Sequence, residues 1–186
     1  MSLPYILLGM TAQPISGYDI KQEFEGSLRH FWHAELSQLY PALKKLVDSG
    51  LADVKTVSSD KGPDKKLYQR TEAGRTTLLN WLAGTPSYSP PKLAILGQVF
   101  FLSELNSKDQ ALEFFNDLLS RYQQIKQSLL AVEQRWQAEE PRYPDNLPDD
   151  QFYQQLTLDA GIRMMDTYIG WADHAIQRIK ARTDEN

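Results

Sequence analysis

The amino-acid sequence predicts a mainly α-helical protein, in which a small domain with a β-hairpin precedes a domain of long helices. Three observations support this prediction. Apolar side chains recur at helical spacing up to residue 50 and then alternate with a period of two up to residue 70. Residues 84–91 have the composition of a linker, with three prolines and one glycine. Beyond residue 107, two heptad seams indicate paired helices.

The helix expected over residues 37–50 has the most informative pattern. Ser37 is suited to cap its start, Pro41 lies near the first turn, and Gly50 ends it. One face is apolar, with Leu39, Leu43, Leu46 and Val47, and the opposite face and its flanks carry Ser37, Gln38, Tyr40, Pro41, Lys44 and Lys45. Such a helix could place its polar groups in a nucleic-acid groove, or it could be an ordinary amphipathic helix with a solvated face.

The flanking segments complete a recognisable order of elements. Ser16 is a good N-cap for a helix over residues 17–25, to which Tyr18, Ile20 and Phe24 would supply apolar contacts. Residues 51–57 and 65–70 read as two strands joined by turn residues, giving a hairpin with a basic tip that carries Lys61, Lys65 and Lys66. Thr71 then caps a helix over residues 72–82. Three helices, a hairpin and a fourth helix are the order of a winged helix-turn-helix domain, which we assign to residues 1–84.

Residues 85–91 form the proline-rich linker, and residues 92–186 are predicted to be helical. A short apolar helix over residues 92–105 precedes a capping box at Ser107–Gln110 and a long helix that Pro141 ends. The apolar residues of this helix are spaced 4-3-4-3-4-3-4, from Ala111 to Trp136. The last helix, residues 149–182, has a second seam from Leu158 to Ile179 and an additional apolar stripe. A second apolar side needs a partner, and a symmetric homodimer is the simplest source.

Charge and composition limit the function classes. The chain has a net charge of −4, and residues 1–84 hold 10 Lys and Arg against 9 Asp and Glu. Any affinity for DNA must therefore come from a local patch. The chain has no cysteine, its first residues lack the basic region of a signal peptide, and its longest apolar stretch, residues 93–105, is too short to span a bilayer. We therefore expect a cytoplasmic protein.

No sequence motif indicates catalysis. There is no glycine-rich phosphate loop, no nucleophile elbow and no zinc-protease motif, and the carboxylates are scattered. The three histidines, His30, His33 and His174, provide one close pair without a third ligand. We expect neither an enzyme nor a metal or cofactor site.

Several segments of the first 84 residues, in order, resemble the PadR family of bacterial transcriptional regulators. The matching segments are Ile6–Gly9, Ser16–Ile20, Phe31–Ala34, Ser37–Leu46, Ser49–Leu51 and Lys65–Gly74. The run Phe-Trp-x-Ala-x-x-Ser-Gln-x-Tyr over residues 31–40 makes the chain look most like the phenolic-acid-sensing branch of the family. The second half resembles the helical dimerisation region of the family in layout more than in motif.

The resemblance implies a homodimeric repressor of a palindromic operator. The helix from Ser37 would enter the major groove, and the hairpin would contact the backbone or the minor groove. Carried over by position, the DNA-binding residues would be Tyr18, Ser37, Gln38, Tyr40, Lys44, Lys65 and Lys66. The alternatives are that the two tyrosines pack between helices and that the lysines are solvated charges.

Members of this branch are released from DNA by hydroxycinnamic acids such as p-coumarate, so the resemblance also implies a phenolic acid as the effector. Such a ligand needs an aromatic slot and a partner for its carboxylate. The candidates are Phe31, Trp32, Phe101, Trp136, Arg163, Tyr168, Trp171 and His174. For each aromatic residue, the alternative is a place in the core or in the dimer interface.

A second function class is compatible with the charge distribution. The nearly neutral first half and the acidic second half, with 10 basic against 15 acidic residues, also suit a dimeric small-molecule-binding or protein-interaction module whose winged helix does not contact DNA. A competition experiment with operator DNA would separate the two classes.

Overall fold

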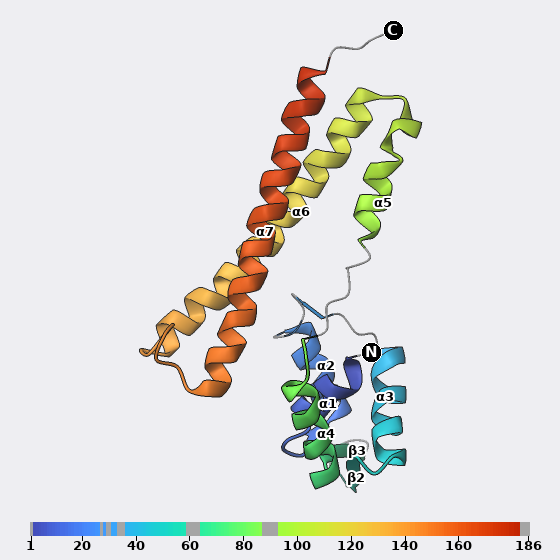
Figure 1. The fold of residues 1–186 in the computed structure, drawn as a ribbon, viewed down its shortest axis with the longest axis vertical. Helices are drawn as coiled ribbons and strands as arrows, with labels where there is room; N and C mark the ends of the chain where they lie inside the picture. The colour runs from blue at the N-terminus through green and yellow to red at the C-terminus, as the bar shows by residue number, and fades with distance from the viewer. Residues whose placement is uncertain are drawn as a thin grey trace. The chain divides into compact units, whose positions relative to one another are not determined.

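The computed structural model describes residues 2–26, 28, 31–32, 36–58, 64–86 and 93–182. The chain divides into two compact units, Met1–Ser89 and Pro90–Asn186. In Figure 1 the first unit contains α1 to α4 with the strands, and the second contains α5 and the two long helices α6 and α7. Lys61, at the tip of the predicted hairpin, lies outside the described residues, as do His30 and His33.

The first unit begins with α1 (Leu3–Met10), which is followed by a two-residue strand and a second helix. The strand β1 (Ile15–Ser16) was not predicted. Ser16 caps α2 (Gly17–Glu25) as expected, because its Oγ accepts the N–H of Asp19 at 3.1 Å and donates to the Asp19 carboxylate at 2.7 Å. Ile20 and Phe24 enter the core, whereas Tyr18 is 63% exposed. The expectation that Tyr18 makes apolar core contacts was therefore wrong.

The helix α3 (Leu36–Asp48) begins one residue earlier than predicted. Ser37 therefore lies inside the first turn and is not the N-cap. Pro41 lies beyond that turn, inside the helix, and its missing N–H leaves the carbonyl of Ser37 without its usual helical partner. The helix tolerates this because Pro41 is on the solvent side, where water can reach that carbonyl. Gly50 ends the segment with a φ of 70°.

Three strands form a small antiparallel sheet in the order β1-β3-β2. The predicted hairpin is present as β2 (Ala52–Val57) and β3 (Lys65–Arg70), with Ala52 opposite Arg70 and Val57 opposite Lys65. The short β1 pairs with the other edge of β3, Ile15 opposite Tyr68. Of the six residues of β2 only Ala52 is buried. The hairpin therefore extends into solvent, as a wing does.

The helix α4 (Glu72–Ala83) closes the first unit against the turn after α3. Its cap is Thr71, whose Oγ accepts the N–H of Gly74 at 3.1 Å and donates to the carbonyl of Gly50 at 2.8 Å. The close approach requires a glycine, since a Cβ on Gly74 would lie 2.0 Å from the carbonyl oxygen of Leu51.

One hydrophobic core joins all elements of the first unit. Its buried members come from four helices and two strands: Leu7, Leu8, Ile20, Phe24, Leu39, Leu43, Leu46, Ala52, Tyr68 and Leu78. The leucines predicted for the inner face of α3 are all 3% exposed or less. The predicted winged helix-turn-helix architecture is confirmed.

The second unit begins with two short helices where a single one was expected. α5 (Ala94–Phe100) ends at Phe101, and a 3-10 turn, η1 (Leu102–Leu105), follows. Asn106 then adopts a left-handed conformation with a φ of 50°. Ser107 caps α6 (Lys108–Glu139) through the N–H of Gln110, at 3.3 Å, as the capping box predicted.

The two long helices α6 and α7 (Asp149–Ala181) run in opposite directions and pack against each other through their seams (Figure 1). The core of the unit is formed by Phe115 and Leu118 of α6 with Ala172 and Ile176 of α7, and Ile95 and Val99 of α5 pack against it. The mainly helical second half is confirmed. Part of the additional stripe on α7 is covered by α5 of the same chain, whereas Leu156 and Met164 remain nearly half exposed.

Candidate nucleic-acid interface and ligand cavity

The outward face of α3 is a continuous polar surface over a buried anchor. Ser37, Gln38, Lys44 and Lys45 are exposed on one side of the helix, opposite the buried leucines. Lys44 forms an ion pair with Asp48, with the Nζ 2.6 Å from the carboxylate oxygen. Both side chains are more than half exposed, so water weakens this pair and a phosphate can compete for the lysine.

Tyr40 lies where α3 meets the start of α2. Its ring packs so closely on Gly17 that a Cβ added there would be 2.6 Å from the ring carbon Cε1 and 3.0 Å from the hydroxyl oxygen. The side chain is nevertheless 46% exposed. Tyr40 therefore has both of the roles considered from the sequence, because one edge packs between helices and the other faces solvent.

The hydroxyl of Tyr40 also influences a buried neighbour. Burial raises the pKa of Tyr68 above its ordinary value, and the nearby Tyr40 raises it further. Both phenols are thus neutral hydrogen-bonding groups at physiological pH. Tyr18, the second residue of α2, extends into solvent next to this pair in sequence order, at the positive end of the helix.

The wing carries the second group of predicted contacts. Lys65 and Lys66 open β3, and both side chains are exposed. The neighbouring Asp64 accepts a hydrogen bond from the hydroxyl of Ser58 at 3.2 Å, which joins the two ends of the hairpin. The wing and α3 belong to one rigid unit, since β3 contributes Tyr68 to the core that holds Leu39 and Leu43.

The structure does not collect the eight predicted effector residues in one place. In the first unit, Phe31 is 47% exposed and Trp32 packs on the core. In the second unit, Phe101 is 64% exposed, and the ring of Trp136 packs edge-on against Tyr143, 6.5 Å between centroids. His174 is exposed. The carboxylate of Asp159 accepts a hydrogen bond from Arg163 at 2.8 Å and, with that bond, raises the guanidinium pKa above its usual value.

Two of the eight, Tyr168 and Trp171, line a cavity of about 270 Å³ in the second unit. Sequence reasoning missed the other five lining residues, Leu93, Ile95, Leu96, Tyr122 and Thr167. Tyr122 was assigned only to the α6 seam. Its position opposite Tyr168 could have been found by aligning the two antiparallel seams, but the contribution of α5 could not.

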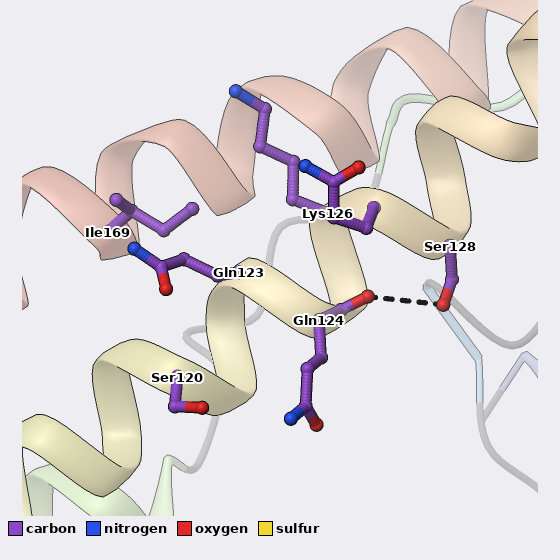
Figure 2. Close-up of a pocket in the computed structure, with 7 residues that line it drawn as sticks. Ser120, Gln123, Gln124, Lys126, Ser128 and Ile169 are labelled. Carbon is purple, nitrogen blue, oxygen red and sulfur yellow. Dashed lines mark hydrogen bonds between the residues drawn. The ribbon is translucent and has the colours of Figure 1, made fainter.

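A larger hollow of about 710 Å³ follows the polar side of α6. Figure 2 shows its lining, in which Ser120, Gln123, Gln124, Lys126 and Ser128 come from α6 and Ile169 from α7. The hydroxyl of Ser128 donates to the carbonyl of Gln124 at 3.1 Å. None of the described lining residues is aromatic, so this hollow does not offer the slot that an aromatic acid requires.

The described part of the chain contains no group of three or more His, Cys, Asp or Glu side chains that could hold a metal ion. Within the same residues, no helix combines the length and the apolar character needed to cross a membrane.

Comparison with known proteins identifies the family. Residues 6–80 match the model of the transcriptional regulator PadR-like family. The negative transcriptional regulator PadR of Bacillus subtilis is 30% identical over 179 residues, which cover 95% of this chain and 97% of that protein. The chain belongs to the PadR family of transcriptional regulators. Regulation of transcription is not an enzymatic activity.

Solved structures of PadR family members extend the likeness to the whole chain. The crystal structure of Bacillus subtilis PadR in complex with operator DNA has a TM-score of 0.80 and 29% identity, and the match covers 96% of this chain and 99% of that one. The same regulator in complex with p-coumaric acid has a TM-score of 0.73 and 28% identity, over 97% and 96% of the two chains. Residues 91–180 match a second family model, the C-terminal region of virulence activator alpha.

Proposed function

We propose that this PadR family member is a DNA-binding repressor that recognises a palindromic operator as a homodimer and is released by a small phenolic acid. The observation that carries the proposal is the exposed polar face of α3, held on a buried leucine anchor next to a basic wing. In this arrangement α3 enters the major groove and Lys65 and Lys66 contact phosphates. The relative that was solved with operator DNA supports it.

The division of labour follows the sequence prediction. Residues 1–84 would bind DNA, residues 85–91 would link, and residues 92–186 would dimerise. Met164, Leu156 and Tyr153 of α7 are between 46% and 66% exposed, and Ile125 of the α6 seam is 46% exposed. A homodimer that buries these side chains removes apolar surface from water and duplicates α3 about a two-fold axis. Two copies of α3 explain why the operator would be palindromic, and a regulator acting on bacterial DNA works in the cytoplasm.

Release by a phenolic acid is supported by the relative solved with p-coumaric acid and by the aromatic cavity of the second unit. Of the predicted effector residues, Tyr168 and Trp171 are the two that we retain for this cavity. Phe31, Trp32, Phe101, Trp136, Arg163 and His174 are outside its described lining.

A gel shift with the upstream region of the protein's own gene tests the proposal. We expect a shifted band at low salt that weakens steeply as salt rises, because phosphate contacts release counterions, and that disappears on addition of p-coumarate. Gln38→Ala should weaken the band, whereas Gln22→Ala, an exposed glutamine on α2, serves as the matched control. Absence of any band at low salt would refute DNA binding, and a band that p-coumarate does not affect would refute only the proposed effector.

The near-neutral first unit and the Lys44–Asp48 pair favour one alternative, an interaction module whose winged helix contacts a protein and not DNA. Operator DNA would compete with a protein partner only if both used α3. A partner that stays bound in the presence of excess operator, together with a negative gel shift, would select this alternative.

A further inference from the structure

The cavity of the second unit has aromatic walls. The rings of Tyr122 and Tyr168 lie 5.2 Å apart between centroids and are tilted by 31°. Trp171, one turn further along α7, packs edge-on against Phe115 at 5.6 Å, which fixes its orientation. Leu93 and Leu96, from the start of α5, complete the lining. A volume of about 270 Å³ is at the small end for ligand sites and suits a molecule with a single ring.

The polar groups of the cavity are hydroxyls. Neither the Tyr122 nor the Tyr168 hydroxyl makes a hydrogen bond to another described residue. Burial, and next the proximity of Tyr168, raises the pKa of Tyr122, so this phenol stays protonated and can both donate and accept. Thr167 already donates its hydroxyl hydrogen to the carbonyl of Arg163 at 3.1 Å and keeps only its acceptor capacity.

No charged side chain belongs to the described lining of the cavity. Arg163, one turn before Thr167 on α7, is held by Asp159, and its side chain is 76% exposed. An ionised carboxylate that entered the cavity would lose its hydration without gaining a cation, which is strongly unfavourable. A neutral phenol would instead find two free hydroxyl partners and an aromatic slot.

We propose that this cavity binds a one-ring phenol and recognises its ring and hydroxyl group through Tyr122 and Tyr168, while a carboxylate on the same ligand stays outside. This inference rests on the proposed function, since it specifies the effector site of a ligand-responsive regulator. It assigns Tyr122, which the sequence placed only in a helix seam, to ligand recognition.

Calorimetric titration of the full-length protein with three probes tests the assignment. The probes are p-coumarate, its uncharged methyl ester, and cinnamate, which lacks the ring hydroxyl. We expect the ester to bind within about threefold of p-coumarate and cinnamate to bind about 5- to 10-fold more weakly, as the loss of one hydrogen bond implies. In the Tyr122→Phe/Tyr168→Phe variant, p-coumarate should bind as weakly as cinnamate. Tyr153→Phe, at an exposed position of α7, is the matched control.

Each contrary outcome overturns the inference. These are loss of binding by the ester, equal binding of cinnamate and p-coumarate, an unaltered double variant, or no binding of p-coumarate at all. Circular dichroism melting of the variants shows whether they fold. The failure of the proposed function is distinguishable: the calorimetric pattern can hold while p-coumarate leaves the gel shift unchanged, or the gel shift can respond while the pattern is absent.

Discussion

Substitution of Gly17 by alanine tests the contact that fixes Tyr40 between α2 and α3. Gly17 is the first residue of α2, is buried, and does not have a positive φ, so alanine is compatible with its backbone. The new methyl group would lie 2.6 Å from Cε1 of Tyr40, where ordinary contacts are at least 3.4 Å. The ring must therefore move by roughly 1 Å, since packed interiors hold few voids to absorb the overlap.

The magnitude follows from two opposing terms. Overpacking by one methyl group typically costs about 1–3 kcal/mol. Replacing glycine by alanine at a compatible position contributes about 0.4–1 kcal/mol of stability by restricting the unfolded chain. With Tyr40 present we expect Gly17→Ala to lower the free energy of unfolding by about 1–2 kcal/mol. In a Tyr40→Ala background the overlap disappears, and the same change should raise it by about 0.5–1 kcal/mol.

Urea unfolding of four proteins measures this cycle: wild type, Gly17→Ala, Tyr40→Ala and the double variant. Protein concentration must be the same throughout, because dimerisation would make stability depend on it. The expected coupling is about 2 kcal/mol and includes a change of sign. If Gly17→Ala has the same effect in both backgrounds, Tyr40 does not pack on Gly17. A gel shift of Gly17→Ala should also show weakened binding, since the displaced ring belongs to the proposed DNA surface.

Four further variants test other parts of the molecule. Lys65→Ala should weaken binding to every DNA sequence and reduce the salt slope by about 0.9 per protomer, unlike Lys180→Ala at the exposed end of α7. Gln38→Ala should instead relax discrimination at one base pair of the half-site, by about 1–3 kcal/mol in a binding competition. Ser16→Ala removes the cap of α2 and should cost about 1 kcal/mol in urea unfolding. Arg142→Ala should raise the pKa of Glu140 from about 2 toward 4.5 in an NMR titration, because the hydrogen bonds from Arg142 are the main cause of the depression. The stabilisation from this pair is present above the unfolded-state pKa and is lost as pH falls toward 2, so the acid sensitivity of the wild type between those values should diminish in the variant. An unchanged salt slope, unchanged discrimination, unchanged stability or an unchanged titration would contradict the respective assignments.

Local signals predicted the elements of the first unit well. The caps Ser16 and Thr71 depend only on a side chain and an amide three residues later, so the sequence contains the whole interaction. The strand β1 was missed for the opposite reason. A two-residue strand has no period of its own, and it exists because Ile15 and Ser16 meet Tyr68 and Leu67 across the sheet.

The second unit shows what periodicity cannot provide. The seams of α6 and α7 predicted that these helices pair, but a second apolar stripe on α7 was interpreted only as a dimer surface. The structure divides that stripe, because α5 covers the region around Tyr168 and Trp171 while Met164 stays nearly half exposed. The break at Phe101, which turns the chain from α5 into η1, determines where α5 lies, and no apolar spacing encodes it.

The charge distribution constrains how such a protein would discriminate between DNA sequences. A strongly basic domain binds any duplex tightly, because counterion release is independent of sequence. Here residues 1–84 carry 10 basic against 9 acidic side chains, and Asp48 already occupies Lys44. The non-specific term is therefore small, and the contacts of Gln38 and Ser37 with base edges gain relative weight. Near-neutrality, which argued against DNA binding when only the net charge was considered, is what a regulator with few operators and a large excess of competing DNA requires.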